Sequence, residues 1–180
     1  MKRFRLMLLP IVVLGLASFG LAQDDAQKSF DQLKTLAGTW QGRVSLDPPQ
    51  KDMANGDQMQ ISMRVTSRGN AMVHEMKDVK ASDDPTRNDH PLTMFYVDNG
   101  KLLLTHYCDA GNRPRMVART SPDGNTIDFD FVDVSGNTQY GHMQHATFTI
   151  IDPNHHTEDW TFVEPGDKLM RGHMDLQRVK

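Results

Sequence analysis

The sequence predicts an all-β protein, a single antiparallel up-and-down β-barrel of about ten strands with a short N-terminal helix. Two observations carry this prediction. After residue 38, short segments alternate apolar and polar residues, as from Met59 to Thr66, and turn residues separate nearly all of them. No long helical pattern interrupts these segments, so we expect them to pair in sequence order and to close into a barrel.

Residues 1–22 have the features of a secretory signal peptide. Residues 2, 3 and 5 are basic, residues 6–19 form an apolar run, and small residues lead up to Ala22. The apolar run is short for a membrane-spanning helix, which needs about 20 residues. We therefore expect cleavage near Ala22, a bacterial periplasmic or extracellular location, and a mature β-barrel domain of residues 23–180 without stable membrane insertion.

Charge and cysteine content narrow the functional classes. The chain carries 20 basic and 23 acidic residues, and removal of the basic signal residues would change the net charge from −3 to −6. The charges are interspersed and form no basic patch, so we expect no nucleic-acid partner. Cys108 is the single cysteine and cannot form an internal disulfide, so stability depends on packing and on the closed sheet.

The first elements follow from spacing and turn residues. Three apolar residues at helical spacing predict a short amphipathic helix from Ser29 to Ala37. The first strand is expected to begin at Thr39 and to end before Pro48. The polar segment 81–90 is the longest clear loop, and we expect it to form a rim or a lid.

Hairpin turns predict which side chains face the interior, because residues opposite each other across a hairpin share a face. The turns are expected at Arg68-Gly69, Asn99-Gly100, 121–124, 152–156 and 165–167. The predicted inward pairs are Met63–His74, Thr93–His106, Met116–Phe129, Phe148–Trp160 and Glu158–Met174. Outside the barrel, the third turn sets Arg115 opposite Asp130 as an ion pair, and the fourth leaves His155 and His156 as a solvated surface pair.

The Asn99-Gly100 hairpin is apolar on both faces. We place His106 and Cys108 inside, because Phe95 and Leu104 on their face belong to the more deeply buried residue types. The other face then leaves an apolar patch outside, which a helix, a loop or a second subunit in a homodimer would cover.

The predicted interior combines methionine, aromatic and ionisable side chains. Methionine is flexible and polarizable and often lines adaptable apolar sites, whereas buried ionisable groups are costly unless paired. This composition favours a cavity that holds water or a ligand, and the alternative is a solid core in which methionines fill gaps. The candidate ligand-binding residues are Met63, Met72, His74, His106, Cys108, Met116, Phe129, Phe148, Glu158, Trp160 and Arg178.

Metal and enzyme motifs are weaker. His106 and Cys108 on one strand, with His74 nearby, offer an imidazole–thiolate pair suited to zinc or copper, but no complete ligand motif accompanies them. No nucleophile elbow, phosphate-binding loop or dinucleotide fingerprint occurs. We therefore assign no catalytic or metal-binding residue, and a Glu158–histidine pair acting as acid and base is the enzyme alternative.

Gly38-Thr39-Trp40, after a short helix and before a strand meander, resembles the opening of calycins, the superfamily of lipocalins and fatty-acid-binding proteins. The resemblance implies structural roles for Gly38 and Trp40, with Trp40 closing the barrel base and Arg178 or Arg171 packing across it. The strand number is similar to that of nitrobindins, which bind haem through a histidine near the C-terminus. That residue would be His173 here, and the hairpin register turns His173 outward.

Residues 104–116 resemble a group of uncharacterised bacterial secreted proteins with a lipocalin-like barrel. We predict an exported barrel that binds a small apolar or amphipathic molecule, with His74, His106, Glu158 and Arg178 orienting its polar end. The alternatives are a haem- or metal-binding barrel and an enzyme, and the sequence identifies no cofactor.

Overall fold

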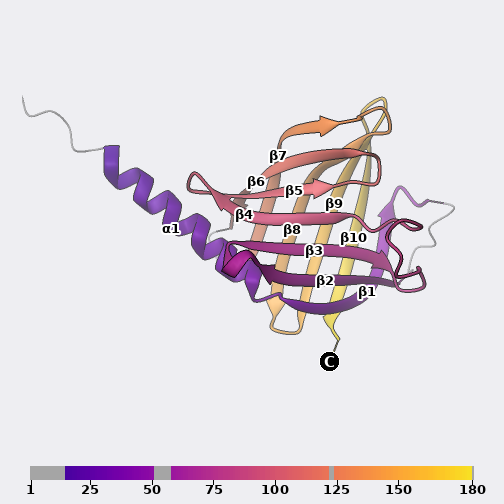
Figure 1. The fold of residues 1–180 in the computed structure, drawn as a ribbon, viewed down its shortest axis with the longest axis horizontal. Helices are drawn as coiled ribbons and strands as arrows, with labels where there is room; N and C mark the ends of the chain where they lie inside the picture. Colours follow the sequence, from indigo (N-terminus) through magenta and orange to yellow (C-terminus); the bar gives the residue numbers. More distant parts are fainter. Residues whose placement is uncertain (1–14, 51–57, 122–123, 180) are drawn as a thin grey trace, which may run out of the picture.

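The computed structural model describes residues 15–50, 58–121 and 124–179 (Figure 1). This part of the chain forms ten antiparallel strands in one closed barrel. Each strand pairs with its neighbours in the sequence, and the first pairs with the last. The predicted up-and-down barrel is therefore confirmed.

The strands alternate in direction around the barrel, and a helix precedes them. The helix is α1 (Gly15–Lys34), and a short 3-10 turn, η1 (Ser67–Gly69), joins the second and third strands. The strands are β1 (Gly38–Asp47), β2 (Gln58–Thr66), β3 (Ala71–Asp78), β4 (Leu92–Asp98), β5 (Lys101–Tyr107), β6 (Asn112–Thr120), β7 (Thr126–Gly136), β8 (His142–Asp152), β9 (His155–Glu164) and β10 (Lys168–Arg178).

Helix α1 differs from its predicted bounds, Ser29 to Ala37, at both ends. It begins at Gly15 and continues past the predicted cleavage site near Ala22, whereas residues 1–14 of the predicted signal peptide lie outside the described residues. It ends at Lys34, because the three following backbone N–H groups each donate to the carbonyl three residues earlier and so form tighter turns. Within the described residues, no helix is long and apolar enough to cross a membrane.

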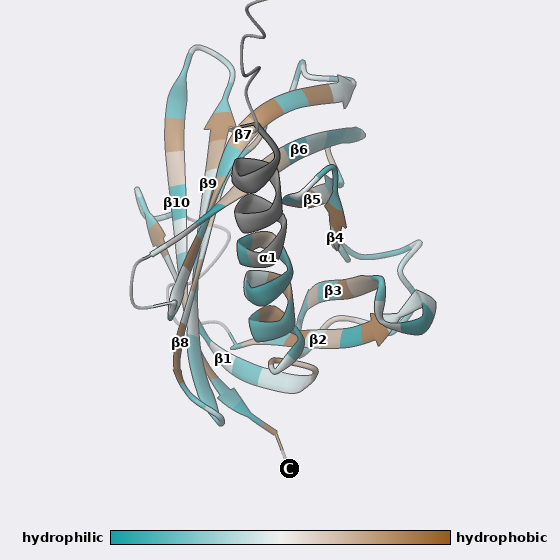
Figure 2. Ribbon diagram, turned by 90° about the vertical axis from the view of Figure 1, so that its left-hand side faces the viewer, coloured by the Kyte–Doolittle hydropathy of each residue, from teal (hydrophilic) through white to brown (hydrophobic). Residues whose placement is uncertain are grey.

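The C-terminal half of α1 covers one end of the barrel, which we call the closed end. Phe30, Leu33 and Leu36 are buried and belong to the same hydrophobic core as Trp40. Figure 2 shows α1 in front of the barrel, between β8–β10 on one side and β2–β5 on the other, and the coloured C-terminal half of the helix has a hydrophilic outer face. The helical spacing of the apolar residues therefore produces the buried stripe that the sequence predicts.

Trp40 and Arg178 complete the closed end, as the calycin resemblance implies. Trp40 is fully buried, and its Nε1–H donates to the Leu36 carbonyl at 2.8 Å. The Arg178 guanidinium carbon lies 4.1 Å from the centroid of the Trp40 ring, and its nitrogens donate to the carbonyls of Ala37 and Thr35. Arg178 thus ties β10 to the chain that leaves α1.

Gly38 leaves room for this arginine. Its φ of +144° lies in the region that favours glycine, and a Cβ atom there would collide with the Arg178 guanidinium. Gly38 thus makes space for the Arg178 side chain, and Trp40 is held in place by its hydrogen bond to Leu36.

Three of the five predicted inward pairs are confirmed. Met63 pairs with His74, Thr93 with His106, and Glu158 with Met174. The other two predictions are wrong by two residues. The structure pairs Met116 with Phe131 instead of Phe129, and Trp160 with Ala146 instead of Phe148. Phe129 and Phe148 remain buried inside, because side chains return to the same face every second residue.

The shift in the β6–β7 register also changes the surface ion pairs. Arg115 pairs with Asp133, and Asp130 pairs with Arg119, so the predicted Arg115–Asp130 pair is wrong. A register shift between Arg115 and Met116 accompanies this pairing.

The turn before β9 is shorter than predicted. Asp152 pairs with His155, so Pro153 and Asn154 alone form the turn instead of residues 152–156. Strand β9 therefore begins at His155, and His156 points inward and is fully buried. The prediction of a solvated His155–His156 surface pair is wrong for His156.

The outer face of β4 and β5 carries the predicted apolar patch. Met94, Tyr96 and Leu103 are half-buried within the single chain, and Tyr107 is exposed. A homodimer that covers this face stays a prediction.

Candidate functional site

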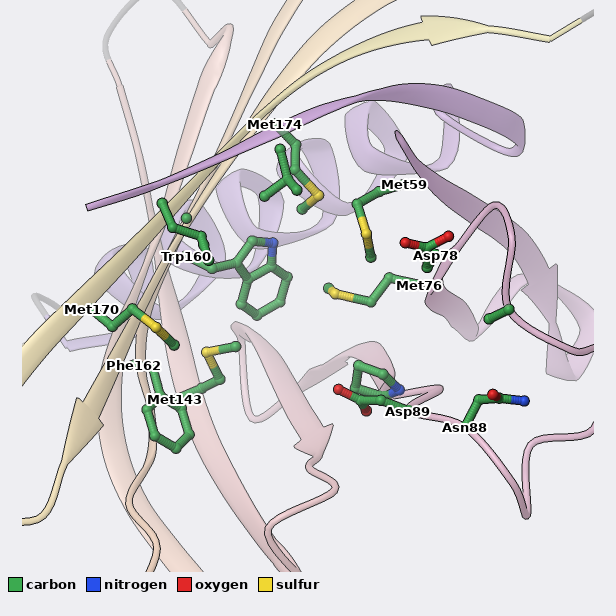
Figure 3. Close-up of a pocket in the computed structure, with 15 residues that line it drawn as sticks. Met59, Met76, Asp78, Asn88, Asp89, Met143, Trp160, Phe162, Met170 and Met174 are labelled. Carbon is green, nitrogen blue, oxygen red and sulfur yellow. The ribbon is translucent and has the colours of Figure 1, made fainter. Parts of the chain in front are cut away.

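A cavity of about 470 Å³ lies at the end of the barrel opposite α1, which we call the open end (Figure 3). Its walls come from β1, β2, β3, β8, β9 and β10, and the loop 79–91 between β3 and β4 forms part of its rim. The volume is within the range of about 300–1,000 Å³ that is typical of small-molecule sites.

Sulfur-containing and aromatic side chains dominate the walls. Trp160 and Phe162 on β9 provide the two aromatic rings. The five methionines are Met59, Met76, Met143, Met170 and Met174. Such a wall is apolar and adaptable, because methionine has several rotatable bonds and a polarizable sulfur.

The cavity owes part of its space to Gly172. This residue lies between Met170 and Met174 on the inward face of β10, and it pairs with Leu46 on β1 and with Trp160 on β9. A Cβ atom at position 172 would lie 3.4 Å from Leu46 Cδ2, so a larger side chain would extend between Leu46 and Trp160. A glycine at this level leaves the space empty.

Hydrogen bonds within the rim loop hold its polar residues at the cavity. The Asn88 amide donates to the carbonyls of Ser82 and Asp84, and His90 Nε2 lies 3.1 Å from the Ser82 carbonyl. Asn88 and Asp89 line the cavity from this loop. The segment 81–90, predicted to be a rim or a lid, thus contributes to the rim.

The charges at the rim are acidic. Among the described residues that line the cavity, the charged side chains are Asp78, at the end of β3, and Asp89. Burial and the adjacent Asp109 carboxylate raise the pKa of Asp89 to about 6. Asp89 is therefore partly protonated in mildly acidic solution and charged at pH 7 and above.

A buried polar cluster lies behind Trp160, and we call it the Glu158 cluster. It consists of Glu158, His74, His156 and the Trp160 indole nitrogen. Glu158 Oε2 accepts from Trp160 Nε1 and from His74 Nε2, each at 3.0 Å, and Oε1 accepts from His156 Nε2 at 3.1 Å. The carboxylate and both imidazoles are fully buried. The cluster thus connects β3 and β9 across the barrel interior.

These contacts keep Glu158 ionised. Burial alone would raise its pKa, but the nearby His74 and the hydrogen bonds from His156 and His74 outweigh burial and lower the pKa below its usual range. Both imidazoles must donate through Nε2, because an ionised carboxylate only accepts.

His106 lies close to the Glu158 cluster but has a different partner. Its Nδ1 is 2.8 Å from the Thr93 hydroxyl, and its ring centroid is 5.3 Å from that of Trp160. Burial, together with the charge of His74, lowers the pKa of His106 to about 3. His106 is therefore a neutral imidazole over the physiological pH range.

The structure distributes the predicted ligand-binding residues over three levels of the barrel. Trp160 lines the cavity, and His74, His106 and Glu158 lie directly behind it. The residues packed in the hydrophobic core are Met63, Met72, Met116, Phe129 and Phe148. Arg178 is at the closed end, where Trp40 and backbone carbonyls occupy its guanidinium, so it does not reach the cavity.

Cys108 follows the end of β5 and is half-buried, and burial raises the pKa of its thiol. Among the residues that the structure describes, no group of three or more His, Cys, Asp or Glu side chains is arranged to hold a metal ion. The haem ligand that the nitrobindin resemblance implies does not face the interior: His173 is exposed, and its Nδ1 lies 2.7 Å from Asp159 Oδ1 on the outer surface.

Sequence reasoning did not assign Asp78, Asp89, Met143 or Gly172 to the site. The alternation along β10 already turns Gly172 inward, and the polar loop 81–90 contains Asp89. The sequence pattern could therefore have identified these two residues as candidates. Which level of the interior is empty depends on how distant strands pack, and no local pattern reports it.

Comparisons with known proteins identify relatives of the fold. No protein-family model and no curated protein matches the sequence. Rv2717c from M. tuberculosis aligns with a TM-score of 0.59 and 13% identity, over 84% of this chain and 98% of its own. A protein of unknown function from the DUF3598 family of Nostoc punctiforme PCC 73102 aligns with a TM-score of 0.52 and 9% identity. This second alignment covers 82% of this chain and 49% of the neighbour. Identities this low show a shared fold and nothing finer.

Proposed function

We propose that the protein is an exported, calycin-like barrel that binds a small apolar or amphipathic molecule in the cavity at the open end. The observation that carries the proposal is the contrast between the two ends of the interior. The closed end is filled by α1 and by aromatic side chains, whereas the open end has a cavity of about 470 Å³ with mostly apolar walls. Contact between apolar walls and water is unfavourable in free energy, and an apolar ligand that replaces the water would remove this unfavourable contribution.

The composition of the walls supports a ligand of adaptable shape. Five methionines surround the cavity together with Trp160 and Phe162, and flexible thioethers repack around different apolar surfaces. The polar rim supports a ligand whose polar end remains near water. The calycin relationship is supported by the barrel topology and by the packing of Arg178 on Trp40.

The enzyme alternative has less support. Both carboxylate oxygens of Glu158 accept hydrogen bonds from within the protein, and the Glu158 cluster lies behind Trp160, which separates it from the cavity. A buried carboxylate held in this way stabilises the interior, and it is poorly placed to meet a substrate.

A fluorescence titration tests the proposal. The neutral probe N-phenyl-1-naphthylamine should bind saturably with enhanced emission. Gly172→Leu should weaken its binding at least tenfold, about 1.4 kcal/mol, because the new side chain occupies the cavity. Gly172→Ala should have a smaller effect, since its Cβ makes only a close contact with Leu46.

Tyr107→Ser is the matched control, because it removes an exposed aromatic residue from the outer face and leaves the cavity unchanged. Probe affinity that is equal in the wild type and in Gly172→Leu would refute the site. Loss of binding in Tyr107→Ser would assign the probe to the outer apolar patch.

A further inference from the structure

We infer that the cavity selects ligands that carry a positive charge beside an apolar body, such as hydrophobic amines and quaternary ammonium compounds. This inference rests on the proposed function and names the ligand class of the same site. The observations behind it are the sign of the charges in the cavity lining, the placement of the aromatic rings and the partners of Lys77 and His90.

The charged groups at the cavity have one sign. In the described part of the lining, Asp78 and Asp89 are the charged residues. They come from the end of β3 and from the rim loop, and a third carboxylate, Asp109, is adjacent to Asp89. Figure 3 shows Asp78, Asn88 and Asp89 on one side of the cavity and the aromatic residues on the other.

Two basic residues near the rim, Lys77 and His90, have acidic partners of their own. Lys77 forms an ion pair with Asp83 on the outer part of the loop, and His90 contacts the Ser82 carbonyl and Glu75. Neither residue lines the cavity. The rim carboxylates therefore meet a ligand without a basic side chain from the described lining between them.

This arrangement discriminates between ligand charges. The carboxylate of a fatty acid would lie beside Asp78 and Asp89 in a partly desolvated site, where like charges repel strongly. An ammonium group in the same place would be attracted by both carboxylates. An uncharged ligand would gain neither attraction nor repulsion, so its affinity measures the apolar contribution alone.

The opposite wall also suits a cation. Trp160 and Phe162 line the cavity across from the rim carboxylates in the view of Figure 3. The faces of aromatic rings carry negative electrostatic potential, and tryptophan attracts cations more strongly than other aromatic residues. A quaternary ammonium group, which cannot donate hydrogen bonds, can use this wall and the carboxylates together.

Isothermal titration of the full chain with three ligands of equal chain length tests the inference. The ligands are dodecyltrimethylammonium, dodecanol and dodecanoate, with the two ionic ligands below their micellar concentrations and dodecanol below its solubility limit. We expect the ammonium compound to bind at least tenfold more tightly than dodecanoate. In Asp78→Asn/Asp89→Asn this preference should shrink to less than threefold, while the affinity for dodecanol stays within twofold of the wild type.

Asp98→Asn is the matched control, because it removes one negative charge from the exposed hairpin at the closed end. This variant should keep the full preference for the ammonium compound. Asp89→Asn alone, at the rim loop, provides a second test if the double variant does not fold.

Asp89 also predicts how the preference depends on pH. The groups that face it are Asp109, Cys108 and His90. Because the pKa of Asp89 is raised to about 6, ammonium affinity should fall as the pH decreases from 7.5 to 5.5. Asp89→Asn should remove most of this dependence.

The outcomes separate the two proposals. If dodecanoate binds as tightly as the ammonium compound, or if the double variant keeps the full preference, the inference is overturned and the cavity remains a ligand site. If none of the three ligands binds, the proposed function fails and the inference fails with it. If Gly172→Leu leaves ammonium affinity unchanged, the cation binds outside the cavity and the inference is again overturned.

Discussion

At the scale of single residues, Glu158 is a fully buried ionisable group with three hydrogen-bond partners. Its carboxylate is fully buried and accepts from His74, His156 and Trp160. A buried charge is tolerated only when its hydrogen bonds are satisfied. Removal of one partner leaves the remaining polar groups buried without a hydrogen bond, which destabilises the folded protein. Loss of a single hydrogen bond in the Glu158 cluster should therefore lower the free energy of unfolding.

Glu158→Gln should reduce the free energy of unfolding by about 3 kcal/mol. The NH2 group of the glutamine amide would face N–H groups of His74, His156 or Trp160, which also donate, so at least one hydrogen bond would be lost. Urea unfolding measures the change. Asp159→Asn is the control, since Asp159 is the next residue of β9, faces outward and pairs with His173 at the surface. It should cost less than about 1 kcal/mol. Equal losses in the two variants would contradict a special role for the Glu158 cluster.

His106 predicts a pH dependence of stability. Its pKa is lowered to about 3 in the folded protein, whereas an unfolded histidine titrates near pH 6.5. Between these values the unfolded chain binds a proton that the folded chain does not, so stability falls as the pH decreases below about 6.5, by up to about 1.4 kcal/mol per pH unit.

Urea midpoints at pH 7.5 and pH 5 test this prediction. His106→Gln keeps a polar partner for Thr93 and removes the titrating ring, so its stability should change less between the two pH values than that of the wild type. Glu158 contributes little over this window, because its carboxylate is ionised in both states there. An equal pH dependence in the variant would show that other groups cause it.

At the scale of elements, the closed end depends on one junction between α1, β1 and β10. Trp40 donates to the last turn after α1, and Arg178 covers its ring and binds two carbonyls of the same turn. The Arg178 guanidinium thus makes both the cation–π contact and the charge-assisted hydrogen bonds. The junction holds the helix against the core without any disulfide.

Trp40→Ala should reduce the free energy of unfolding by about 3–5 kcal/mol, because a fully buried ring leaves a cavity. Arg178→Lys should cost about 1–2 kcal/mol, since lysine keeps the charge but cannot make the same set of hydrogen bonds. Arg171→Lys, at an exposed position of the same strand, is the control and should stay within about 0.5 kcal/mol of the wild type. An unchanged denaturant midpoint in Trp40→Ala would contradict the closed-end role.

At the scale of the whole molecule, the two ends of the barrel differ. Helix α1 and the aromatic core fill the closed end, and the cavity with its acidic rim occupies the open end. An up-and-down barrel has no free sheet edges, so these ends are where function can be added without disturbing the strand pairing. The solved structures that align with this chain share the barrel fold.

The sequence by itself determined the barrel and most inward faces. Alternation is a local signal with a period of two residues, so Phe129 and Phe148 are buried even though their predicted partners were displaced by two positions. The packing of a late-strand arginine on Trp40 was expected only from the calycin resemblance, which left Arg178 and Arg171 as alternatives, and the structure places Arg178 there.

Only the tertiary structure decided where the interior is empty and what surrounds the buried charge. His156 became an interior residue because Pro153-Asn154 makes a two-residue turn, a choice that depends on how β8 and β9 pair. The cavity exists because Gly172 faces Leu46 and Trp160 across three strands, and the rim loop adds Asp89 to a lining that already contains Asp78. Such contacts join residues far apart in the chain, and close packing between them, which no local pattern encodes, sets the remaining space.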